Sequence, residues 1–481
     1  MPLMTGEEYK ASLRTLKPDV RFMGRRIADV CSDPITRTGV NAAAVTYDMP
    51  HNPEFEHLAR ARSTLTGEVT NRFTHIHQST DDLLREVRLL RACCQQTGSC
   101  VQRCAGHDAI NGLYTTTYDM DQALGTSYHA RLIDFVKHLQ RNDLIADAGM
   151  TDPKGDRSLP PSKQADPDLY LRVVEKRKDG IVVRGAKAHQ TGAVNSHEFI
   201  AIPTTAMGPD DAAYAVSFAI PADTKGMLYV FGKQTNDERK ALCRIDQGNS
   251  CFGMVGGEAL IILQDVLVPW ERVFMCGEYE FSGQLVQRFA EYHRSRYGAC
   301  RGGVADVITG AAVAVAEMQG TAKASHVRDK ITEMVHLTES MFACSVAAAA
   351  MGAPTPSGAY AFNSMMANVC KLNVTRNMYE IARLAQDIAG GFIATMPSEQ
   401  DLDDPETGPL IEKYFRGVAG VPTEHRLRIG RLIENMTGST ALVESMHGAG
   451  SPQAMRVFIR RLANLEHKKL AALRLAGVAE S

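Results

Sequence analysis

The sequence of 481 residues lacks a strong excess of either charge, a long apolar run and a basic leader segment. Its formal net charge is −2 and its pI is about 6.7, so electrostatics gives no reason to expect nucleic acid or an anionic membrane as partner. No continuous apolar run reaches the roughly 18 residues of a membrane-spanning helix, and "MPLMTGEEYK" does not resemble a signal peptide. We therefore expect a cytoplasmic protein with no membrane or nucleic-acid partner.

Short metal and nucleotide motifs are missing as well. The cysteine-bearing segments do not match the CxxC pairs of zinc ribbons, and "TDPKGDRS" is not a phosphate loop of the GxxxxGK type. The eleven cysteines are an odd number in a long chain without a secretion signal. This argues against a disulfide framework and in favour of free thiols, most of them buried.

Composition and periodicity divide the chain into three parts. Residues 1–147 carry helical patterns, residues 148–277 are rich in strand-like runs, and residues 278–481 are alanine-rich and helical again. We expect an α+β fold with an N-terminal helical domain, a central β-barrel-like domain and a C-terminal helical bundle domain.

Local signals support this division. Thr5 and Glu8 form a capping box at the start of one predicted helix. Ser79 is a predicted N-cap of another helix, which Gly98 is expected to end. The pair Asp179-Gly180 predicts a hairpin turn between two strands.

Metal-ligating side chains occur in two distant segments. Cys100 and Cys104 in "SCVQRC" are four residues apart, so on a helix they share one face with Cβ atoms about 5–6 Å apart. His293, Tyr297 and Cys300 in "YHRSRYGAC" share a face of a second predicted helix. Two such helices packed together bring three thiols and one imidazole to one point. This set suits structural zinc as well as an iron–sulfur cluster, and the spacing is equally compatible with core cysteines.

Longer stretches are more specific than any of these motifs. They are "HQSTDDL", "SCVQRC", "NDLIADAGMTDPKGDRS", "DGIVVRGAKAHQTGAVNSHE", "YHRSRYGAC", "DIAGGFIATMPSE" and "ESMHGAGSPQ". Over nearly its whole length the chain resembles the 4-hydroxyphenylacetate 3-hydroxylase family, and within it the branch of acyl-CoA dehydratases. The resemblance implies an acyl-CoA dehydrogenase-like fold with a C-terminal four-helix bundle, a bound FAD and a 4Fe-4S cluster.

The resemblance also assigns binding residues. It implies that Cys100, Cys104, His293 and Cys300 hold the cluster, and that the protein is a homotetramer with FAD near its subunit interfaces. The implied flavin contacts lie in one loop, at one strand end and at one helix C-terminus: Asp152, Lys154, Gly155, Asp156, Arg157, Ser158, His189, Gln190, Thr191, Gly390 and Gly391.

The implied reaction is the radical dehydration of 4-hydroxybutyryl-CoA to crotonyl-CoA, with vinylacetyl-CoA delta-isomerase activity. The C3 hydrogen is not activated by the thioester, and FAD can accept and return the single electron that makes it acidic. The resemblance implies that His293 is a ligand and a base in turn, and that Glu258 and Glu444 are active-site carboxylates. Tyr297 is placed to donate a hydrogen bond to substrate or cluster.

One residue departs from the branch, and three other functions remain open. Where the dehydratases have a lysine after the last cysteine ligand, this chain has Arg301, so the substrate can be a related acyl-CoA. The first alternative is a reduced-flavin-dependent aromatic monooxygenase. The second is a vinylacetyl-CoA isomerase that removes no water, and the third is a flavin-free relative in which the ligand set binds zinc as a structural brace.

Overall fold

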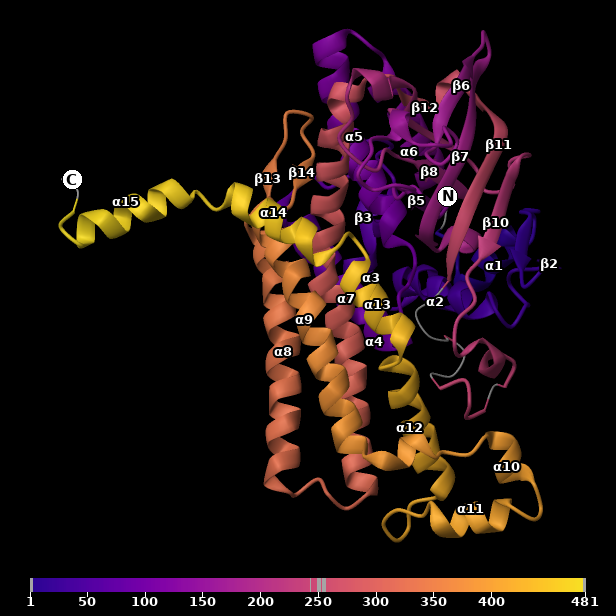
Figure 1. The fold of residues 1–481 in the computed structure, drawn as a ribbon. Helices are drawn as coiled ribbons and strands as arrows, with labels where there is room; N and C mark the ends of the chain where they lie inside the picture. Colours follow the sequence, from indigo (N-terminus) through magenta and orange to yellow (C-terminus); the bar gives the residue numbers. More distant parts are fainter. Residues whose placement is uncertain (1–2, 243, 249–251, 253–256, 479–481) are drawn as a thin grey trace.

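The computed structural model describes residues 3–242, 244–248, 252 and 257–478. Its helices are α1 (Gly6–Leu13), α2 (Arg37–Asp48), α3 (Glu56–Ala59), α4 (Thr80–Thr97), α5 (Cys104–Leu124), α6 (Tyr128–Asn142), α7 (Ser282–Met318), α8 (Ser325–Ala350), α9 (Ser364–Ala389), α10 (Glu399–Asp403), α11 (Gly408–Tyr414), α12 (Thr423–Met436), α13 (Ser439–His447), α14 (Pro452–Leu462) and α15 (Leu465–Leu475). Its strands are β1 (Val20–Phe22), β2 (Arg25–Ile27), β3 (Arg60–Arg62), β4 (Val69–Asn71), β5 (Ala146–Gly149), β6 (Arg172–Lys176), β7 (Gly180–Thr191), β8 (Glu198–Ala201), β9 (Val216–Pro221), β10 (Met227–Phe231), β11 (Glu258–Pro269), β12 (Val273–Cys276), β13 (Ala353–Pro354) and β14 (Tyr360–Ala361). The fold is mixed α+β, as expected, with a helical C-terminal region (Figure 1).

Two larger sheets form the main β part of the described structure, and β3-β4 and β13-β14 are separate two-stranded sheets (Figure 1). One has six strands in the order β2-β1-β10-β11-β7-β6, and the other has four in the order β12-β9-β8-β5. The long strands β7 and β11 are antiparallel, with Gly180 opposite Pro269 at one end and Thr191 opposite Glu258 at the other. The predicted hairpin turn at Asp179-Gly180 joins β6 to β7, which confirms that prediction. This register places Glu258, at the start of β11, beside Thr191, at the end of β7 for which a flavin contact is predicted.

The N-terminal part is less purely helical than expected. Strand β1 pairs in parallel with β10, with Val20 opposite Tyr229, and β2 extends the same sheet. The side chains of Val20 and Phe22 are buried there, while Arg21 between them points to solvent. Three residues are too few for the alternation to be distinguished from a loop in the sequence. Tertiary pairing therefore decides the structure of this segment.

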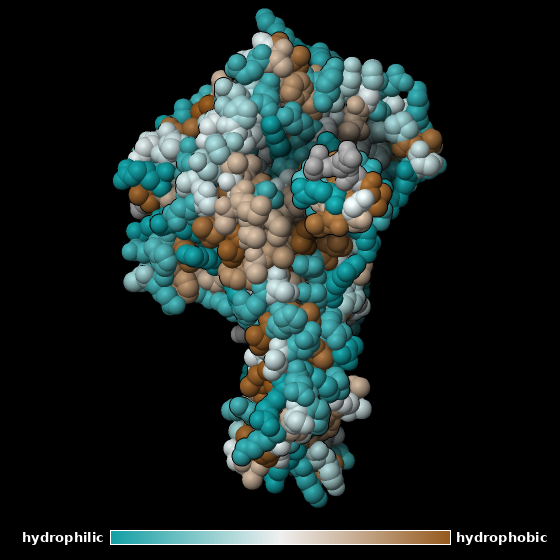
Figure 2. All heavy atoms as spheres, turned by 90° about the vertical axis from the view of Figure 1, so that its left-hand side faces the viewer, coloured by the Kyte–Doolittle hydropathy of each residue, from teal (hydrophilic) through white to brown (hydrophobic). Residues whose placement is uncertain are grey.

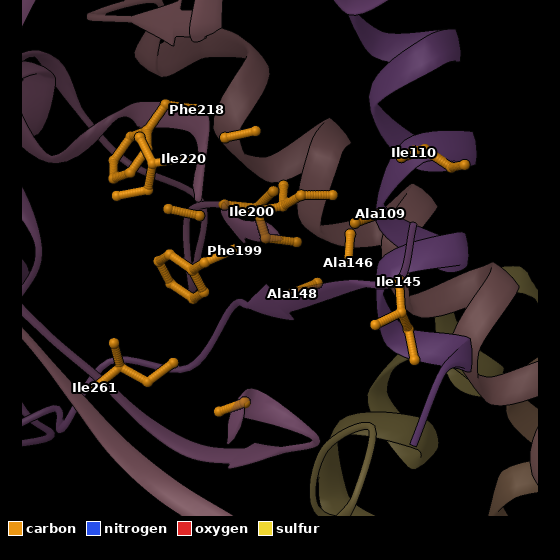
Figure 3. Packing of buried hydrophobic residues seen from close by; sticks show 14 of the residues in the cluster. Ala109, Ile110, Ile145, Ala146, Ala148, Phe199, Ile200, Phe218, Ile220 and Ile261 are labelled. Carbon is orange, nitrogen blue, oxygen red and sulfur yellow. The ribbon is translucent and has the colours of Figure 1, made fainter. Parts of the chain in front are cut away.

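Helix α5 packs against the four-stranded sheet. Figure 3 shows Ala109 of α5 beside Ala146 of β5 and the preceding Ile145, with Ile200 of β8 next to them. The same apolar cluster continues through β9 and reaches Ile261 of β11 in the six-stranded sheet. The core thus fixes α5, and with it the segment that begins at Cys104, relative to both sheets.

Helices α7, α8 and α9 form a long bundle (Figure 1). Its apolar core also contains Leu83, Val87 and Leu90 of α4. The bundle therefore includes a helix from the N-terminal part, although the sequence led us to expect a bundle built by C-terminal residues. Ser79 caps α4 as predicted, because its hydroxyl accepts a hydrogen bond from the Asp82 backbone N–H. The helix carries the chain directly to the "SCVQRC" segment.

Among the described residues one helix is apolar enough, by length and composition, to cross a membrane, namely the segment Tyr279–Met318 that contains α7. Of its most apolar 18-residue window, 67% is buried inside the molecule. The sequence shows no continuous apolar run here, because polar residues such as Arg294 and Arg296 interrupt it. The packing of α7 against α4, α8 and α9 accounts for its apolar character.

Candidate active site

The cysteine loop, residues 98–104, connects α4 to α5. Gly98 adopts a left-handed φ of 59° and ends α4, as predicted. Helix α5 begins only at Cys104, so the prediction that Cys100 and Cys104 share a helix face was wrong. Gln102 has a positive φ of 55°, and the turn it makes still brings the two thiols together. The Cys104 thiol donates a hydrogen bond to Cys100, which lowers the pKa of Cys100.

Helix α7 presents the second half of the predicted ligand set. His293, Tyr297 and Cys300 all lie within this continuous helix, as the spacing predicts. Burial raises the pKa of Cys300 to about 12, and its electrostatic interaction with Cys100 acts in the same direction. The ligand atoms of Cys104 and His293, together with a carboxylate oxygen of Asp108, lie within 4.8 Å of one another. Cys104 and His293 therefore lie together, Cys100 is bonded to Cys104, and Cys300 is near enough to both thiols to interact with them electrostatically.

Tyr297 and Glu444 meet beside this group. The Tyr297 hydroxyl donates a hydrogen bond of 3.0 Å to the Glu444 Oε1 atom on α13. The Arg301 guanidinium contacts the other carboxylate oxygen of Glu444. Burial raises the pKa of Tyr297 well above its usual value, so the phenol is a proton donor in its hydrogen bond. Glu444 thus lies between Tyr297 and Arg301 of α7, and its catalytic role stays a prediction.

A buried lysine that the sequence analysis did not single out lies next to these groups. The Lys371 ammonium lies 3.9 Å from the centroid of the Tyr297 ring and donates a 2.5 Å hydrogen bond to the Ser445 carbonyl near the end of α13. Desolvation lowers the pKa of Lys371 well below its ordinary value, and the positive charge of Arg301 acts in the same direction. By bonding the last turn of α13, Lys371 fixes the helix that carries Glu444.

The other predicted carboxylate, Glu258, borders the cysteine loop from the β side. Its side chain accepts hydrogen bonds from the Thr191 hydroxyl at 3.3 Å and from the Gln234 amide at 3.1 Å. A Cβ atom placed on Gly257 would lie 3.1 Å from the Gln102 side chain. Glu258 and Thr191 therefore lie next to the loop that carries Cys100 and Cys104.

The strand end that precedes Thr191 has mixed exposure. His189 is exposed and has a positive φ of 61°, whereas the Gln190 side chain is buried and donates a 2.6 Å hydrogen bond to the Ala188 carbonyl. The Ala188 backbone N–H bonds the Thr151 carbonyl at the start of the predicted flavin loop. The two predicted flavin segments are thus neighbours in space.

In the predicted flavin loop, residues 152–158, the acidic residues bind protein groups. Asp152 is buried, accepts a 3.0 Å hydrogen bond from the Leu171 backbone N–H and lies 2.9 Å from the Lys187 ammonium. The Asp156 carboxylate accepts hydrogen bonds from the hydroxyl and the backbone N–H of Ser158. Asp152 therefore stabilises the loop from its buried side, and its predicted flavin contact stays a prediction.

The rest of this loop is more open. Arg157 and Ser158 are exposed, and Lys154 is half-buried. Gly155 has a φ of 46°, and a Cβ atom there would lie 2.4 Å from the Gln164 amide oxygen, so only glycine fits. Lys154 and Arg157 remain as the cations that can meet an anionic ligand.

Gly390 and Gly391 lie apart from the other predicted flavin residues. Gly390 ends α9 with a φ of 80°, which confirms the predicted helix C-terminus. This end of α9 is at the bottom of the bundle in Figure 1, beside α12, while β7 lies in the upper part. Within one chain the glycine pair is therefore separated from the strand end of β7.

The structure adds Asp108, Arg296 and Lys371 to the predicted site. Asp108 follows Cys104 by four residues on α5, so helical spacing alone places it on the cysteine's face. Lys371 is a lone charge in the otherwise apolar or uncharged "MMANVCKLNV" segment of α9, a pattern that indicates a buried cation with a specific partner. Arg296 carries no comparable signal, because its role depends on contacts with α4 and α5.

Comparison with known proteins agrees with this arrangement. Residues 5–275 match the family described as "4-hydroxyphenylacetate 3-hydroxylase N terminal", and residues 282–477 match "4-hydroxyphenylacetate 3-hydroxylase C terminal". The 4-hydroxybutyryl-CoA dehydratase/vinylacetyl-CoA-Delta-isomerase of Clostridium aminobutyricum is 49% identical, over 99% of this chain and 100% of its own. The 4-hydroxyphenylacetate 3-monooxygenase oxygenase component of Thermus thermophilus is 26% identical over 90% and 88% of the two chains.

Solved structures give the same relationship. An oxygen-tolerant archaeal 4-hydroxybutyryl-CoA dehydratase from N. maritimus superposes with a TM-score of 0.97 at 48% identity, covering 100% of this chain and 96% of that one. The FAD complex of a 4-hydroxyphenylacetate 3-monooxygenase oxygenase component has the same fold, with a TM-score of 0.85 at 24% identity and coverage of 98% of each chain. A glutaryl-coenzyme A dehydrogenase matches with a TM-score of only 0.53 at 13% identity, over 98% and 95% of the two chains, so the expected acyl-CoA dehydrogenase likeness is weak. The chain belongs to the 4-hydroxyphenylacetate 3-hydroxylase family.

Proposed function

We propose that this protein dehydrates 4-hydroxybutyryl-CoA to crotonyl-CoA and also isomerises vinylacetyl-CoA, using FAD and a 4Fe-4S cluster. The observation that carries the proposal is the meeting of Cys104 with His293, with Cys100 bonded to Cys104, next to the helix face on which Tyr297 bonds Glu444. It occurs in a chain that is 49% identical over its length to a dehydratase with both activities. Relatives named as monooxygenases are about half as similar.

The residues at this place fit a cluster. Three thiols and an imidazole converge from two helices and a loop, and sulfur and nitrogen are ligands that iron–sulfur centres use. Arg301 is buried, its Nε atom has no hydrogen-bond partner among the described residues, and its charge interacts with Cys300 and Cys100. A buried cation that faces sulfur atoms is stabilised by an anionic cluster and is costly without one. When bound, FAD supplies one-electron chemistry and the cluster supplies a Lewis-acidic iron.

The chain's own groups supply the proton transfers. His293 carries an imidazole, a side chain that commonly acts as a general base or acid in enzymes. The Glu444 carboxylate is held by Tyr297 and Arg301, so it is oriented before substrate binds. Glu258, next to the cysteine loop, has Thr191 and Gln234 as its hydrogen-bond donors. Substrate bound between the cysteine loop and α13 would therefore have the carboxylates of Glu258 and Glu444 as further groups for proton transfer.

We assign FAD binding to the exposed residues of the flavin loop and to the neighbouring end of β7. Lys154 and Arg157 suit the diphosphate as cations, and exposed His189 with Thr191 suits the ring system. Gly390 and Gly391 would serve the FAD of a neighbouring subunit, because they lie far from β7 in the same chain (Figure 1).

We also propose a cytoplasmic homotetramer that takes the acyl-CoA as its small-molecule partner. Helix α15 projects away from the body in Figure 1, and Leu465, Leu470 and Leu475 on it are exposed. Figure 2 shows apolar surface on the face from which this arm extends, above a largely polar helical column. An exposed apolar arm of this kind favours burial against another copy of the chain.

The test is a pair of anaerobic assays on the purified protein. We expect crotonyl-CoA from 4-hydroxybutyryl-CoA and from vinylacetyl-CoA, and loss of the first reaction in Cys300→Ser. Turnover of vinylacetyl-CoA alone would favour the isomerase alternative. Hydroxylation of a phenol with reduced flavin and oxygen, without either acyl-CoA reaction, would contradict the proposal and favour the monooxygenase.

A further inference from the structure

Asp108 lies against the predicted ligand His293 and has no role in the site so far. It is on α5, one helical turn after Cys104, and its side chain is buried. Its Oδ2 atom is 2.6 Å from the His293 Nδ1 atom, which is a short hydrogen bond between a carboxylate and an imidazole.

Both oxygens of the carboxylate have nitrogen neighbours in the protein. Its second oxygen, Oδ1, lies 2.8 Å from the Arg296 guanidinium, which also lies 3.3 Å from the buried Glu86 carboxylate. Both oxygens of Asp108 therefore face nitrogen atoms. The Arg296 side chain holds Asp108 in place, and Glu86 in turn helps to hold Arg296.

Two aromatic side chains fix the plane of the same imidazole. Phe289, one turn before His293 on α7, stacks on it with ring centroids 5.4 Å apart and an interplanar angle of 22°. Tyr297, one turn after it, meets it edge-on at 5.4 Å and 84°. The aromatic contacts set the ring plane, and Asp108 selects which ring nitrogen points toward α5.

A glycine explains why the two helices come close enough for this contact. A Cβ atom on Gly112 of α5 would lie 3.1 Å from the Phe289 backbone nitrogen on α7. One turn away from that contact along each helix, Asp108 and His293 meet. A larger residue at Gly112 would separate the helices and lengthen the hydrogen bond.

We propose that Asp108, held by Arg296, is a positioning residue that directs the Nε2 atom of His293 to the cluster iron. The inference rests on the proposed function, because it presupposes the cluster. A carboxylate bonded to Nδ1 fixes the tautomer and orientation of a metal-binding histidine, and loss of such a partner typically lowers metal affinity or activity about 10–100-fold.

The test compares Asp108→Ala with Glu86→Ala, since each variant removes one buried carboxylate from Arg296 but only Asp108 contacts His293. The rate of iron release to a chelator and the visible circular dichroism of the cluster are measured on anaerobic protein, with thermal stability as the check on folding. We expect Asp108→Ala to release iron about 10–100-fold faster than Glu86→Ala and to change the dichroism. Asp108→Asn, which keeps an oxygen acceptor for Nδ1, should restore slow release in part.

Equal release rates in Asp108→Ala and Glu86→Ala would overturn the positioning role, because they would show a general effect on the buried charges. Should the alanine variants not fold, Asp108→Asn and Glu86→Gln carry the comparison with the same expected order. Wild-type protein without iron and sulfide would overturn the proposed function together with this inference. A cluster in the wild type with unchanged iron release in the Asp108 variants would overturn this inference alone.

Discussion

The Tyr297 hydroxyl on α7 donates a 3.0 Å hydrogen bond to the Glu444 carboxylate on α13, although the two residues are 147 positions apart in sequence. Arg301, one turn after Tyr297, contacts the other oxygen of the same carboxylate. Glu444 is therefore oriented by the helix that also carries His293 and Cys300. A change on this face of α7 acts on the cluster ligands and on the carboxylate together.

Replacing Tyr297 by phenylalanine should slow dehydration and leave the fold intact. The variant removes a hydrogen bond to a charged acceptor, a contact typically worth about 1.5–3 kcal/mol, or roughly 10–150-fold in rate if it is needed in the transition state. The measurement is the rate of crotonyl-CoA formation. Tyr292→Phe is the matched control, because its buried hydroxyl bonds only the Tyr360 carbonyl. Equal rates in the two variants would contradict a specific role for Tyr297.

Arg301 should tolerate lysine and not glutamine. Lysine keeps the positive charge next to Glu444 and the thiols, whereas Arg301→Gln leaves a buried carboxylate without its cation. Breaking one partner of a buried ion pair typically costs about 3–5 kcal/mol of stability. Thermal unfolding and iron content of the two variants test this. A glutamine variant as stable and as rich in iron as the lysine variant would show that the charge has no such role.

Asp152 should stabilise the flavin loop and have little direct effect on flavin binding. Asp152→Asn weakens its buried pair with Lys187, so we expect a loss of about 3–5 kcal/mol in stability. Asp156→Asn is the control, since Asp156 is exposed and should change stability by no more than about 0.5 kcal/mol. Arg157→Gln should weaken FAD binding without destabilising the protein. If Asp152→Asn lost FAD at unchanged melting temperature, the structural role assigned here would be wrong.

A buried carboxylate in the four-stranded sheet should make stability depend on pH. Asp147 on β5 is 2% exposed, and one of its oxygens has no hydrogen-bond partner among the described residues. Burial raises its pKa from 3.8 to about 7, so the folded chain binds its proton more tightly than the unfolded chain does. The ionisation of Asp147 therefore lowers the free energy of unfolding as pH rises from about 4 to about 7. Above pH 7 its contribution to the free energy of unfolding is constant.

Asp147→Asn removes this ionisation and tests the effect. At pH 8 the variant should be more stable than the wild type by up to about 4 kcal/mol, at about 1.36 kcal/mol per pKa unit. At pH 4 the two proteins should differ little. Denaturant unfolding at both pH values provides the measurement, and a difference that does not grow with pH would refute the assignment.

The C-terminal arm should be needed for assembly. Replacing Leu470 and Leu475 by glutamate makes the exposed face of α15 polar, and the arm is outside the apolar cores of the body. Sedimentation should then show a smaller assembly than that of the wild type, for which we propose a tetramer, with secondary structure unchanged. Substitution of the exposed Val335 on α8 serves as the control. A variant arm that leaves the assembly intact would contradict this role.

Local signals in the sequence were sufficient for much of the fold. The capping box at Thr5, the N-cap Ser79, the helix end at Gly98 and the turn at Asp179-Gly180 depend on neighbouring residues, and each is present in the structure. Strand β1 was missed because three residues gain their pairing from β10, which is far away in sequence.

The candidate site, like the fold, was predicted from the sequence only where local spacing determines the structure. Helical spacing placed His293, Tyr297 and Cys300 on α7, but it wrongly placed Cys100 on a helix, because the turn at Gln102 is not visible as a pattern. Asp152 lies in a loop that the sequence marks as a ligand-binding loop. Only its contact with Lys187 in the structure shows that the carboxylate is buried and stabilises the loop. The catalytic and cofactor roles of the predicted residues stay predictions until they are measured.

The most direct test of the account is the content of iron, acid-labile sulfide and flavin per chain in protein purified without oxygen. The account predicts about four irons, about four sulfides and about one FAD, with the iron and sulfide lost in Cys100→Ser. Flavin without iron would place the chain's chemistry with the monooxygenases. Zinc without iron or flavin would contradict the account and reduce Cys100, Cys104, Cys300 and His293 to a structural site.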